Sequence, residues 1–428
     1  MEKFIIQGGV PLSGEIMPAG NKNAALPILA ACLLTEDELT VRNVPRIRDV
    51  ESMLGLLERL GVKVAWTGEN EVRLQADNVS VTDVDEELAN RIRASFLVAG
   101  PLLARCGEVR MPPPGGDTIG RRRLDAHLDA FRDLGAKVAG DVWIELSAPP
   151  EGLKPTRIFM DEPSVMGTEN ALLAAALTEG PTTIANAASE PHVQDLARLL
   201  CKMGAQIDGI GSNVMNVVGR DQLGGADHDV CSDHIEIASF MGLAAATSGE
   251  LRIRNVVPED LEGIRRHFRR LGLQSMIEGD DLLVPPEQKL TIRDDQGDAI
   301  PKIDDGPWPA FPADLTSIAL ALATQADGTI MIHEKMFENR LFFVDKLVSM
   351  GARIILCDPH RAVVTGPARL HGERLESPDI RAGMAMLIAA LCAEGTSTIG
   401  NIGEIDRGYE RIDERLRSLG ARIERIEA

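Results

Sequence analysis

A short segment with a central glycine recurs six times along this chain of 428 residues. The copies read LGVKV from Leu60, LGAKV from Leu134, MGAQI from Met203, LGLQS from Leu271, MGARI from Met350 and LGARI from Leu419. Successive glycines are separated by 74, 69, 68, 79 and 69 residues, a spacing typical of a repeated supersecondary unit. Six units of about 71 residues therefore account for the whole chain.

Each unit begins with an alanine-rich apolar run. The runs start at Ala25, Ser95, Ala171, Phe240, Leu315 and Gly383. Runs that are apolar on all sides predict buried helices, and with only 3% aromatic residues the core has to be aliphatic. A strand, an amphipathic helix, the glycine turn and a second strand complete the predicted unit. We therefore expect an α/β protein with two globules of three units each, rather than a long solenoid.

Charge and composition exclude several classes of protein. A net charge of -20 argues against a nucleic-acid partner, which requires a basic surface. The N-terminus lacks the signal-peptide pattern, and no apolar stretch is long enough to span a membrane, so we expect a cytoplasmic location. Six scattered cysteines without a Cys-x-x-Cys pair indicate reduced thiols. The segment HDVCSDH, from His228 to His234, is a weak alternative for a metal site, because no second pair of ligands with zinc spacing exists.

A polar residue precedes or begins each buried run, 37 to 42 residues before the glycine of its unit. These equivalent positions hold Lys22, Arg93, Ser164, His234, Asp314 and Arg381. A cation in the first turn of a helix opposes the helix dipole, but it becomes favourable when an anion binds there. The positions therefore predict an anion site; ordinary surface charges are the alternative.

A second set of charged residues lies 11 to 14 residues before the same glycines: Arg48, Arg122, Glu190, Arg340 and Arg407. Arg48 is expected to be solvated. Arg122 belongs to PPPGGDTIGRRR, a Pro/Gly-rich loop around residues 113–123 that also carries Asp117. Repulsion among three consecutive arginines is relieved by phosphate or carboxylate binding, and the glycine pair permits movement. We call this segment the lid loop; a solvated basic loop is the alternative.

The common nucleotide and catalytic motifs are missing. Neither a Walker A sequence, a strand-anchored G-x-G-x-x-G, a G-x-S-x-G elbow nor H-E-x-x-H occurs. The remaining pattern predicts a site without metal or cofactor, in which arginines, a lysine and two aspartates perform acid–base chemistry on phosphorylated substrates.

At these residues the sequence resembles the UDP-N-acetylglucosamine 1-carboxyvinyltransferases, a family of enolpyruvyl transferases. The motifs that carry the resemblance are NKNAALPI at Asn21, RASF at Arg93, PPGGDTIGRR at Pro113, PSVMGTEN at Pro163, FPAD at Phe311, FENR at Phe337 and EIDRGYERI at Glu404. The resemblance implies a two-lobed inverse α/β barrel with three units in each lobe. Its first lobe would be residues 22–231, including the lid loop, and its second lobe residues 1–21 with 232–428.

The resemblance also assigns roles to the matching positions. Enolpyruvyl transfer from phosphoenolpyruvate to the 3-hydroxyl of UDP-N-acetylglucosamine, an early step of peptidoglycan precursor synthesis, would proceed without a cofactor. Catalysis would involve Asp117, Asp314, Lys22 and Arg407. Phosphoenolpyruvate would be bound by Lys22, Asn23, Arg122, Arg340, Arg381 and Arg407. The UDP-sugar would be bound by Arg93, Arg122, Arg123, Leu124, Asp125, Ser164, Val165 and Asp314, supported by Glu190 and Glu236. We expect a monomer or a weak homo-oligomer that closes on the sugar nucleotide.

Three positions depart from the pattern of many family members. Asp117 stands where many have the cysteine that fosfomycin modifies, Arg123 where many have proline, and Glu162 where some have lysine. The alternatives are the related transferase acting on shikimate 3-phosphate, a paralogue acting on another uridine nucleotide, RNA 3'-terminal phosphate cyclase, and a non-catalytic UDP-sugar-binding paralogue. The NKNAALP and lid-loop motifs favour the sugar-nucleotide branch, the acidity disfavours the cyclase, and two aspartates disfavour a pure binder.

Overall fold

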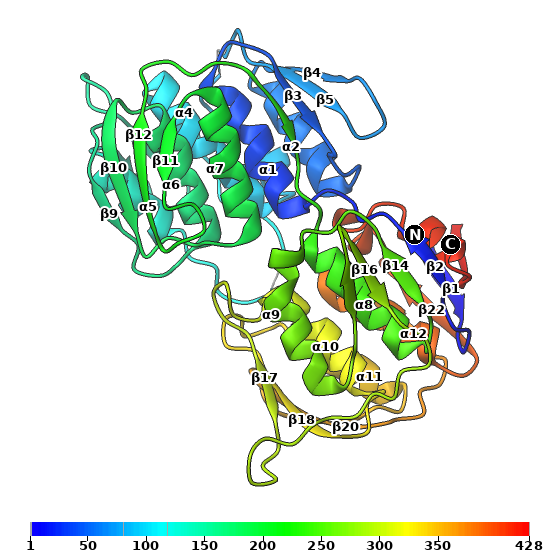
Figure 1. The fold of residues 1–428 in the computed structure, drawn as a ribbon. Coiled ribbons are helices and arrows are strands. Elements are labelled where there is room, and N and C mark those ends of the chain that lie inside the picture. The colour runs from blue at the N-terminus through cyan, green and yellow to red at the C-terminus, as the bar shows by residue number, and fades with distance from the viewer. Residues whose placement is uncertain (1, 80, 118, 428) are drawn as a thin grey trace. The chain divides into compact units, whose positions relative to one another are not determined.

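The computed structural model describes residues 2–79, 81–117 and 119–427. Its contacts divide the chain into two compact units (Figure 1). We call Gly20–Asp117 with Arg122–Cys231 the first lobe, and Met1–Ala19, Thr118–Arg121 and Ser232–Ala428 the second lobe. The first lobe begins at Gly20, two residues before the predicted boundary at Lys22. The tip of the lid loop groups with the second lobe, whereas the whole loop was predicted in the first.

Three buried helices form the centre of each lobe, as the apolar runs predict. In the first lobe they are α1 (Lys22–Ala30), α4 (Ala99–Cys106), preceded by the 3-10 turn η2 (Arg93–Val98), and α6 (Val165–Ala176). There α4 packs on α6, and both α1 and α6 pack on η2. Those of the second lobe are α8 (His234–Ala246), α10 (Thr316–Ala323), preceded by η4 (Ala313–Leu315), and α12 (Ile380–Cys392). Small alanine side chains allow these helices to pack closely on several sides at once.

An amphipathic outer helix follows in every unit. These helices are α2 (Arg48–Arg59), α5 (Asp125–Asp133), α7 (Pro191–Met203), α9 (Pro258–Phe268), α11 (Val344–Ser349) and α13 (Ile412–Ser418). The glycine of each recurring segment follows the helix with φ between +86° and +119°. Glycine adopts this left-handed conformation without a steric penalty, which explains why the turn residue is glycine in all six units.

The sheets lie outside the helices and share one strand order. One sheet of the first lobe has the order β13 (Ala226–Asp229), β3 (Leu39–Arg42), β5 (Val72–Gln75), β4 (Lys63–Trp66). A second sheet has the order β6 (Glu108–Met111), β8 (Ile144–Ser147), β7 (Lys137–Ala139). A third has the order β9 (Arg157–Phe159), β10 (Gly180–Ala185), β12 (Val214–Gly219), β11 (Gln206–Asp208). One sheet of the second lobe has the order β2 (Gly14–Ile16), β14 (Leu251–Ile253), β16 (Asp281–Val284), β15 (Met276–Glu278). A second sheet has the order β17 (Lys302–Asp304), β18 (Gly328–His333), β20 (Arg361–Gly366), β19 (Arg353–Asp358). A third has the order β21 (Arg374–Glu376), β22 (Thr396–Gly400), β1 (Glu2–Gln7), β23 (Arg422–Glu427). The predicted inverse α/β architecture is confirmed, with helices inside and sheets outside.

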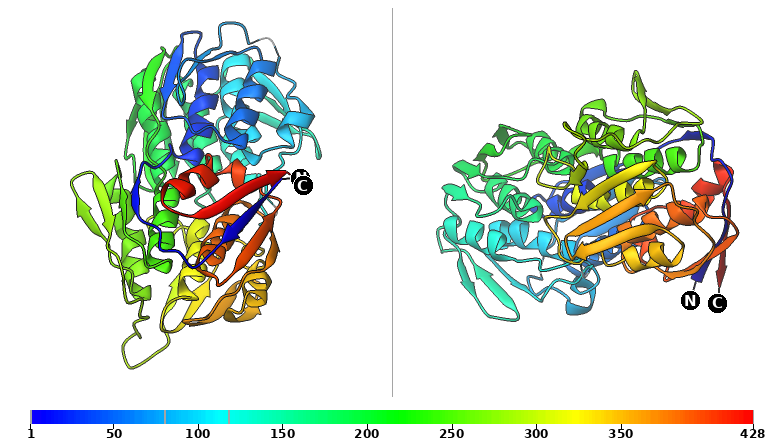
Figure 2. Two further views of the ribbon diagram at one scale, coloured as in Figure 1. Left: turned by 90° about the vertical axis from the view of Figure 1, so that its right-hand side faces the viewer. Right: turned by 90° about the horizontal axis from the view of Figure 1, so that it is seen from below.

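The predicted unit was incomplete in two respects. A hairpin rather than a single strand follows the glycine turn in the first five units, and a further strand pairs in parallel with the first strand of most sheets. Two of these additional strands come from distant parts of the chain, because β13 joins β3 and β2 joins β14. The N-terminal β1 is also distant, but it pairs antiparallel with both β22 and β23, where Phe4 lies opposite Ile399 and Arg425. Figure 2 shows β1 beside the C-terminal strand.

Within the described ranges, the longest apolar helices fall short of the length and hydropathy that a membrane span requires.

Candidate active site

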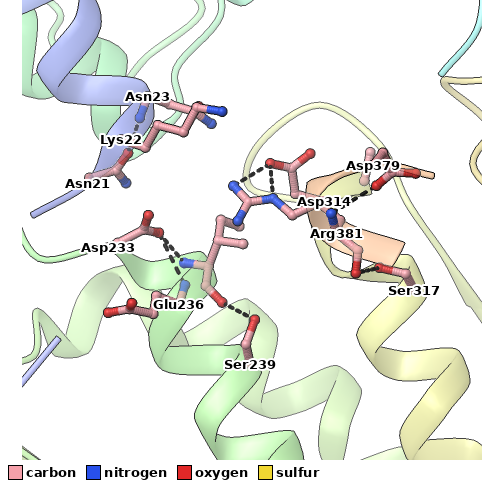
Figure 3. A network of polar contacts seen from close by, with 12 residues as sticks. Asn21, Lys22, Asn23, Asp233, Glu236, Ser239, Asp314, Ser317, Asp379 and Arg381 are labelled. Carbon is pink, nitrogen blue, oxygen red and sulfur yellow. Dashed lines mark hydrogen bonds and ion pairs between the residues drawn. The ribbon is translucent and has the colours of Figure 1, made fainter. Parts of the chain in front are cut away.

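Lys22 begins α1 in the first lobe, and its helix start is fixed by a cap (Figure 3). The side chain of Asn21 accepts hydrogen bonds from the amides of Asn23 and Ala24, at 2.9 and 3.1 Å. Lys22 Nζ lies 2.6 Å from Oδ2 of Asp49, which is in the first turn of α2, and both side chains are nearly buried. Asp49 therefore balances the cation at the helix start. Sequence analysis missed Asp49, because nothing local indicates which outer-helix carboxylate faces α1.

Arg93 holds the base of the lid loop. Its Nη2 donates to the carbonyl oxygens of Arg122 and Arg123, at 2.6 and 3.1 Å. Burial, and then the nearby charge of Arg122, lower the pKa of Arg93 to about 10. The same environment, with burial dominant, lowers the pKa of His127 to about 3. Two cations are thus brought together in a desolvated place, which is the electrostatic condition for an anion site.

The other predicted residues of the first lobe stand at helix starts. Leu124 precedes α5 and Asp125 begins it, while Ser164 caps α6 by accepting from Gly167 N at 3.2 Å and Val165 follows. Arg123 Nε lies 2.9 Å from Asp125, and its Nη2 lies 3.3 Å from Asp161. These contacts hold the Arg123 side chain among neighbouring carboxylates, so its contact with the nucleotide stays a prediction.

Glu190 is the residue before α7, and it has a carboxyl neighbour that the sequence analysis did not single out. Glu169, in α6, is almost completely buried. Burial and the charge of Glu190 raise the pKa of Glu169 well above its ordinary value. Burial and Glu190 thus both favour the protonated form of Glu169, beside a predicted site residue.

The glycine pair of the lid loop has a packing role that differs from the predicted one. A Cβ on Gly115 would lie 1.8 Å from the carbonyl oxygen of Asn90, and one on Gly116, where φ is +102°, would lie 2.8 Å from Cβ of Arg93. The pair is required because the loop lies directly on the backbone that carries Arg93. The predicted movement of the loop stays a prediction. Asp117 follows the pair and is half-buried.

The tip of the lid loop contacts the segment that carries Arg340. The amide of Arg121 donates to Glu338 Oε2 at 3.1 Å, and the amide of Asn339 donates to the carbonyl of Ile119 at 2.9 Å. Residues 119–121 accordingly belong with the second lobe. The sequence placed the whole loop in the first lobe because a contiguous loop gives no signal of a distant partner.

We expect Gly115→Ala to impair the lid loop, since a methyl group cannot fit against Asn90. Loss of activity on the order of 10²-fold is expected if the loop shifts by about 1 Å. Gly55→Ala in α2 is the control, because a Cβ there meets nothing within 4 Å and alanine favours a helix. Steady-state kinetics and thermal melting of both variants check the expectation. Equal activity of the two variants would contradict it.

Asp314 lies between two buried arginines in the second lobe, and Figure 3 shows its contact with Arg381. Its Oδ1 accepts from Nη2 of Arg340, and its Oδ2 lies 3.0 and 2.9 Å from Nε and Nη2 of Arg381. The two arginine side chains are 5% and 4% exposed, whereas Asp314 is 24% exposed. The structure brings these three predicted residues together, and their roles toward the substrates stay predictions. Only the carboxylate retains appreciable access to solvent.

Arg381 is held by several further contacts. Its helix α12 is capped by Asp379, whose side chain accepts from Arg381 N at 2.8 Å, and its carbonyl accepts from Ser317 at 3.2 Å. Its Nη1 lies 3.3 Å from the Tyr409 hydroxyl, which in turn lies 3.1 Å from Ser239. Burial alone would lower the pKa of Arg381, but Asp314 and Tyr409 hold it above its ordinary value. Its charge is therefore permanent.

The remaining predicted residues of the second lobe occupy distinct places. Arg407, in η5 (Ile405–Arg407), pairs with Glu404 at 2.7 Å. Glu236 is buried and accepts from Arg415 and, at 2.7 Å, from the amide of Ala19. These contacts make Glu236 an anchor for the segment entering the lobe, and a substrate role for it stays a prediction.

His234, at the equivalent position of the fourth unit, is neutral near pH 7. Burial and Arg381 lower its pKa to about 4, and its ring packs against Trp308 with centroids 5.7 Å apart. In the HDVCSDH segment, His228 Nε2 lies 3.1 Å from Asp195. Within residues 2–79, 81–117 and 119–427, no group of three or more potential ligand side chains is arranged to hold a metal ion.

The comparisons with known proteins agree with this arrangement. The EPSP synthase (3-phosphoshikimate 1-carboxyvinyltransferase) family matches residues 6–416. The UDP-N-acetylglucosamine 1-carboxyvinyltransferase of Bradyrhizobium diazoefficiens is 57% identical over 99% of this chain and 98% of its own. The proteins of that name from Treponema denticola and Bacteroides thetaiotaomicron are 54% and 48% identical, over 99% and 100% of both chains.

Solved structures support the fold. The enolpyruvyl transferase NikO from Streptomyces tendae has a TM-score of 0.88 at 23% identity, covering 100% of this chain and 99% of that one. An EPSP synthase from Acinetobacter baumannii has a TM-score of 0.76 at 19% identity, covering 100% of both. Full-length identity and a shared fold together show that this chain is a transferase of the UDP-N-acetylglucosamine 1-carboxyvinyltransferase family.

Proposed function

We propose that this protein transfers the enolpyruvyl group of phosphoenolpyruvate to the 3-hydroxyl of UDP-N-acetylglucosamine and releases phosphate, a step in making peptidoglycan precursors. The observation that carries the proposal is the 57% identity, over 99% of the chain, to a protein named for this activity. The cluster of Asp314, Arg340 and Arg381 supports it, because a carboxylate flanked by buried arginines suits a hydroxyl acceptor and an anionic donor.

Asp314 would orient the attacking hydroxyl. Two guanidinium groups hold its carboxylate, which fixes the orientation of a hydrogen-bond acceptor for the substrate hydroxyl. Arg340 Nε is buried and, among the residues that the structure describes, has no hydrogen-bond partner; it would be a donor for a substrate anion.

The reaction would proceed by addition and elimination. Asp117 would donate a proton to the methylene carbon of phosphoenolpyruvate while the sugar oxygen bonds to carbon 2 and the hydroxyl proton passes to Asp314. Loss of a proton from the new methyl group and departure of phosphate would then restore the double bond. Lys22, Asn23, Arg122, Arg340, Arg381 and Arg407 would bind phosphoenolpyruvate, and the remaining predicted residues would bind the nucleotide. A cytoplasmic location and a monomeric or weakly oligomeric state stay predictions.

A phosphate-release assay with phosphoenolpyruvate and a panel of UDP-sugars tests the proposal. Phosphate release is expected with UDP-N-acetylglucosamine, together with a product whose mass increases by one enolpyruvyl group. Release only with another uridine nucleotide would identify a different acceptor, and release with shikimate 3-phosphate would assign the related activity. Binding of UDP-N-acetylglucosamine without release by the intact protein would show a non-catalytic binder.

A further inference from the structure

Two carboxyl groups that take no direct part in the proposed chemistry face each other behind Arg340. Asp305 follows β17, Glu334 follows β18, and both side chains are completely buried. Asp305 Oδ2 is buried and has no hydrogen-bond donor among the residues described. A second ionised carboxylate beside it would be strongly unfavourable in this environment. One proton between the two groups satisfies this oxygen and removes the repulsion.

This pair holds the segment that leads to Arg340. Asp305 Oδ1 accepts from the amide of Lys335, and Glu334 Oε1 accepts from the amides of Met336 and Phe337, at 3.3 and 3.1 Å. Three consecutive amides are therefore fixed by the two carboxyl groups, and Arg340 follows within one turn of chain. Amide contacts of this kind position a side chain by fixing the backbone that carries it.

The same pair is linked to the element that carries Asp314. The Thr316 hydroxyl lies 2.8 Å from Glu334 Oε2 and 2.8 Å from the carbonyl oxygen of Ala313. Ala313 is in η4 beside Asp314, and Thr316 begins α10. Glu334 thus connects the two elements that place Asp314 and Arg340 against each other.

We propose that Asp305 and Glu334 share one proton and act as a positioning pair that fixes Arg340 against Asp314. The effect of this pair on catalysis rests on the proposed function, whereas the shared proton itself does not. With one proton, the pair carries a single negative charge, so that it and Asp314 together balance Arg340 and Arg381. Loss of the proton doubles the charge behind Arg340, attracts its guanidinium away from Asp314 and repels the two carboxyl groups from each other.

The charged surroundings of the pair define its response to pH. Burial and Asp305 raise the pKa of Glu334 above its ordinary value, while Arg340 and the Thr316 hydroxyl oppose the shift. His360 lies near the pair, with its Nδ1 2.7 Å from the backbone carbonyl oxygen of Glu334. Lys335 Nζ lies 2.8 Å from Oδ2 of Asp304. Because the pKa of Glu334 is raised in the folded state, the contribution of its proton to the free energy of unfolding is greatest below the ordinary pKa of 4.5. This contribution decreases as the pH rises through the raised pKa.

Fluorescence of Trp308 gives a local readout that does not depend on catalysis. Trp308 lies between Asp305 and Asp314 in the chain, and Trp66→Phe with Trp143→Phe leaves it as the single tryptophan. We expect the Trp308 emission to change as the pH is raised, with a midpoint near the pKa of about 8–9 that buried glutamates reach. His234, packed on Trp308, titrates only near its pKa of about 4.

The alkaline change should vanish in Glu334→Gln, whose amide group imitates the protonated acid. It should persist in His360→Asn, whose side-chain amide replaces the Nδ1 contact, and in Glu394→Gln, an exposed glutamate of the same lobe. A change that persists in Glu334→Gln, or that vanishes in His360→Asn alone, overturns the proposal.

Kinetics provide the second measurement. Glu334→Ala should lose kcat/KM on the order of 10²-fold, as expected for a displaced site group, whereas Glu334→Gln should recover most of it at neutral pH. Equal losses in the two variants contradict positioning by the shared proton.

The two proposals can fail separately. If the intact protein releases no phosphate, the proposed function fails, but the Trp308 titration still tests the pair. If enolpyruvyl transfer occurs and the Trp308 titration is absent, only the proposal of the shared proton fails.

Discussion

Asp314→Ala is expected to lower turnover by about 10²-fold or more, the range typical of acid–base and positioning groups. The structure adds a stability effect, because the substitution leaves Arg340 and Arg381 as buried cations without their shared carboxylate. Breaking a buried ion pair costs about 3–5 kcal/mol, and the partial exposure of Asp314 favours the lower end. Single-turnover kinetics and urea unfolding measure the two effects separately.

Asp314→Asn separates hydrogen bonding from charge. The amide can still accept from one arginine, but it cannot take a proton or balance two cations. We expect folded protein that still binds UDP-N-acetylglucosamine and has turnover close to that of Asp314→Ala. Asp345→Ala, at an exposed aspartate that pairs with its neighbour Lys346 at 3.0 Å, should change stability by less than about 0.5 kcal/mol. Near wild-type turnover of Asp314→Ala would refute the assigned role.

Resistance to fosfomycin is the expected phenotype at Asp117. A thiolate attacks an epoxide readily, whereas a carboxylate is a weak nucleophile, so covalent inactivation at this position should be lost. Asp117→Cys should gain time-dependent inactivation with an adduct on the new cysteine. If Asp117 donates the catalytic proton, turnover of the wild-type protein should also decline as pH rises, and the cysteine variant should hold its activity to higher pH.

Peptide mapping by mass spectrometry gives this experiment its control. Burial raises the pKa of Cys32, Cys106 and Cys392, the last to about 12, so these thiols should not react. Cys357 is exposed, and Cys357→Ser removes this background nucleophile. An adduct on Asp117 in the wild-type protein, or an Asp117→Cys variant that is no more sensitive, would show that residue 117 does not face the substrate.

Local sequence patterns were sufficient for the architecture and for the pairing of two predicted site residues. The six glycines mark the repeat because a residue without Cβ adopts the left-handed turn after each outer helix without a steric penalty. The apolar runs fix the inner helices because their burial is visible in composition. The equivalent positions at the helix starts then predicted Asp314 and Arg381, which the structure joins at 2.9 Å.

The same patterns did not reveal the packing of the lid loop. The sequence predicts movement from Gly115 and Gly116, and the structure adds that both glycines allow close contact with Asn90 and Arg93. The loop tip contacts Glu338, more than two hundred residues away in the chain. A glycine permits both movement and close approach, and a single sequence does not distinguish them.

The sequence by itself determined the repeat, the inner and outer helices and the chemical types of the site residues, because each depends on residues within a few turns of one another. Only the tertiary structure decided that β1 completes the last sheet, that Asp49 balances Lys22, and that Asp305 faces Glu334. Strand pairing between distant segments and the desolvation of one charge beside another arise from the packed interior. Neither is encoded in the spacing of neighbouring residues, so these contacts and their pKa shifts appear only when the chain is folded.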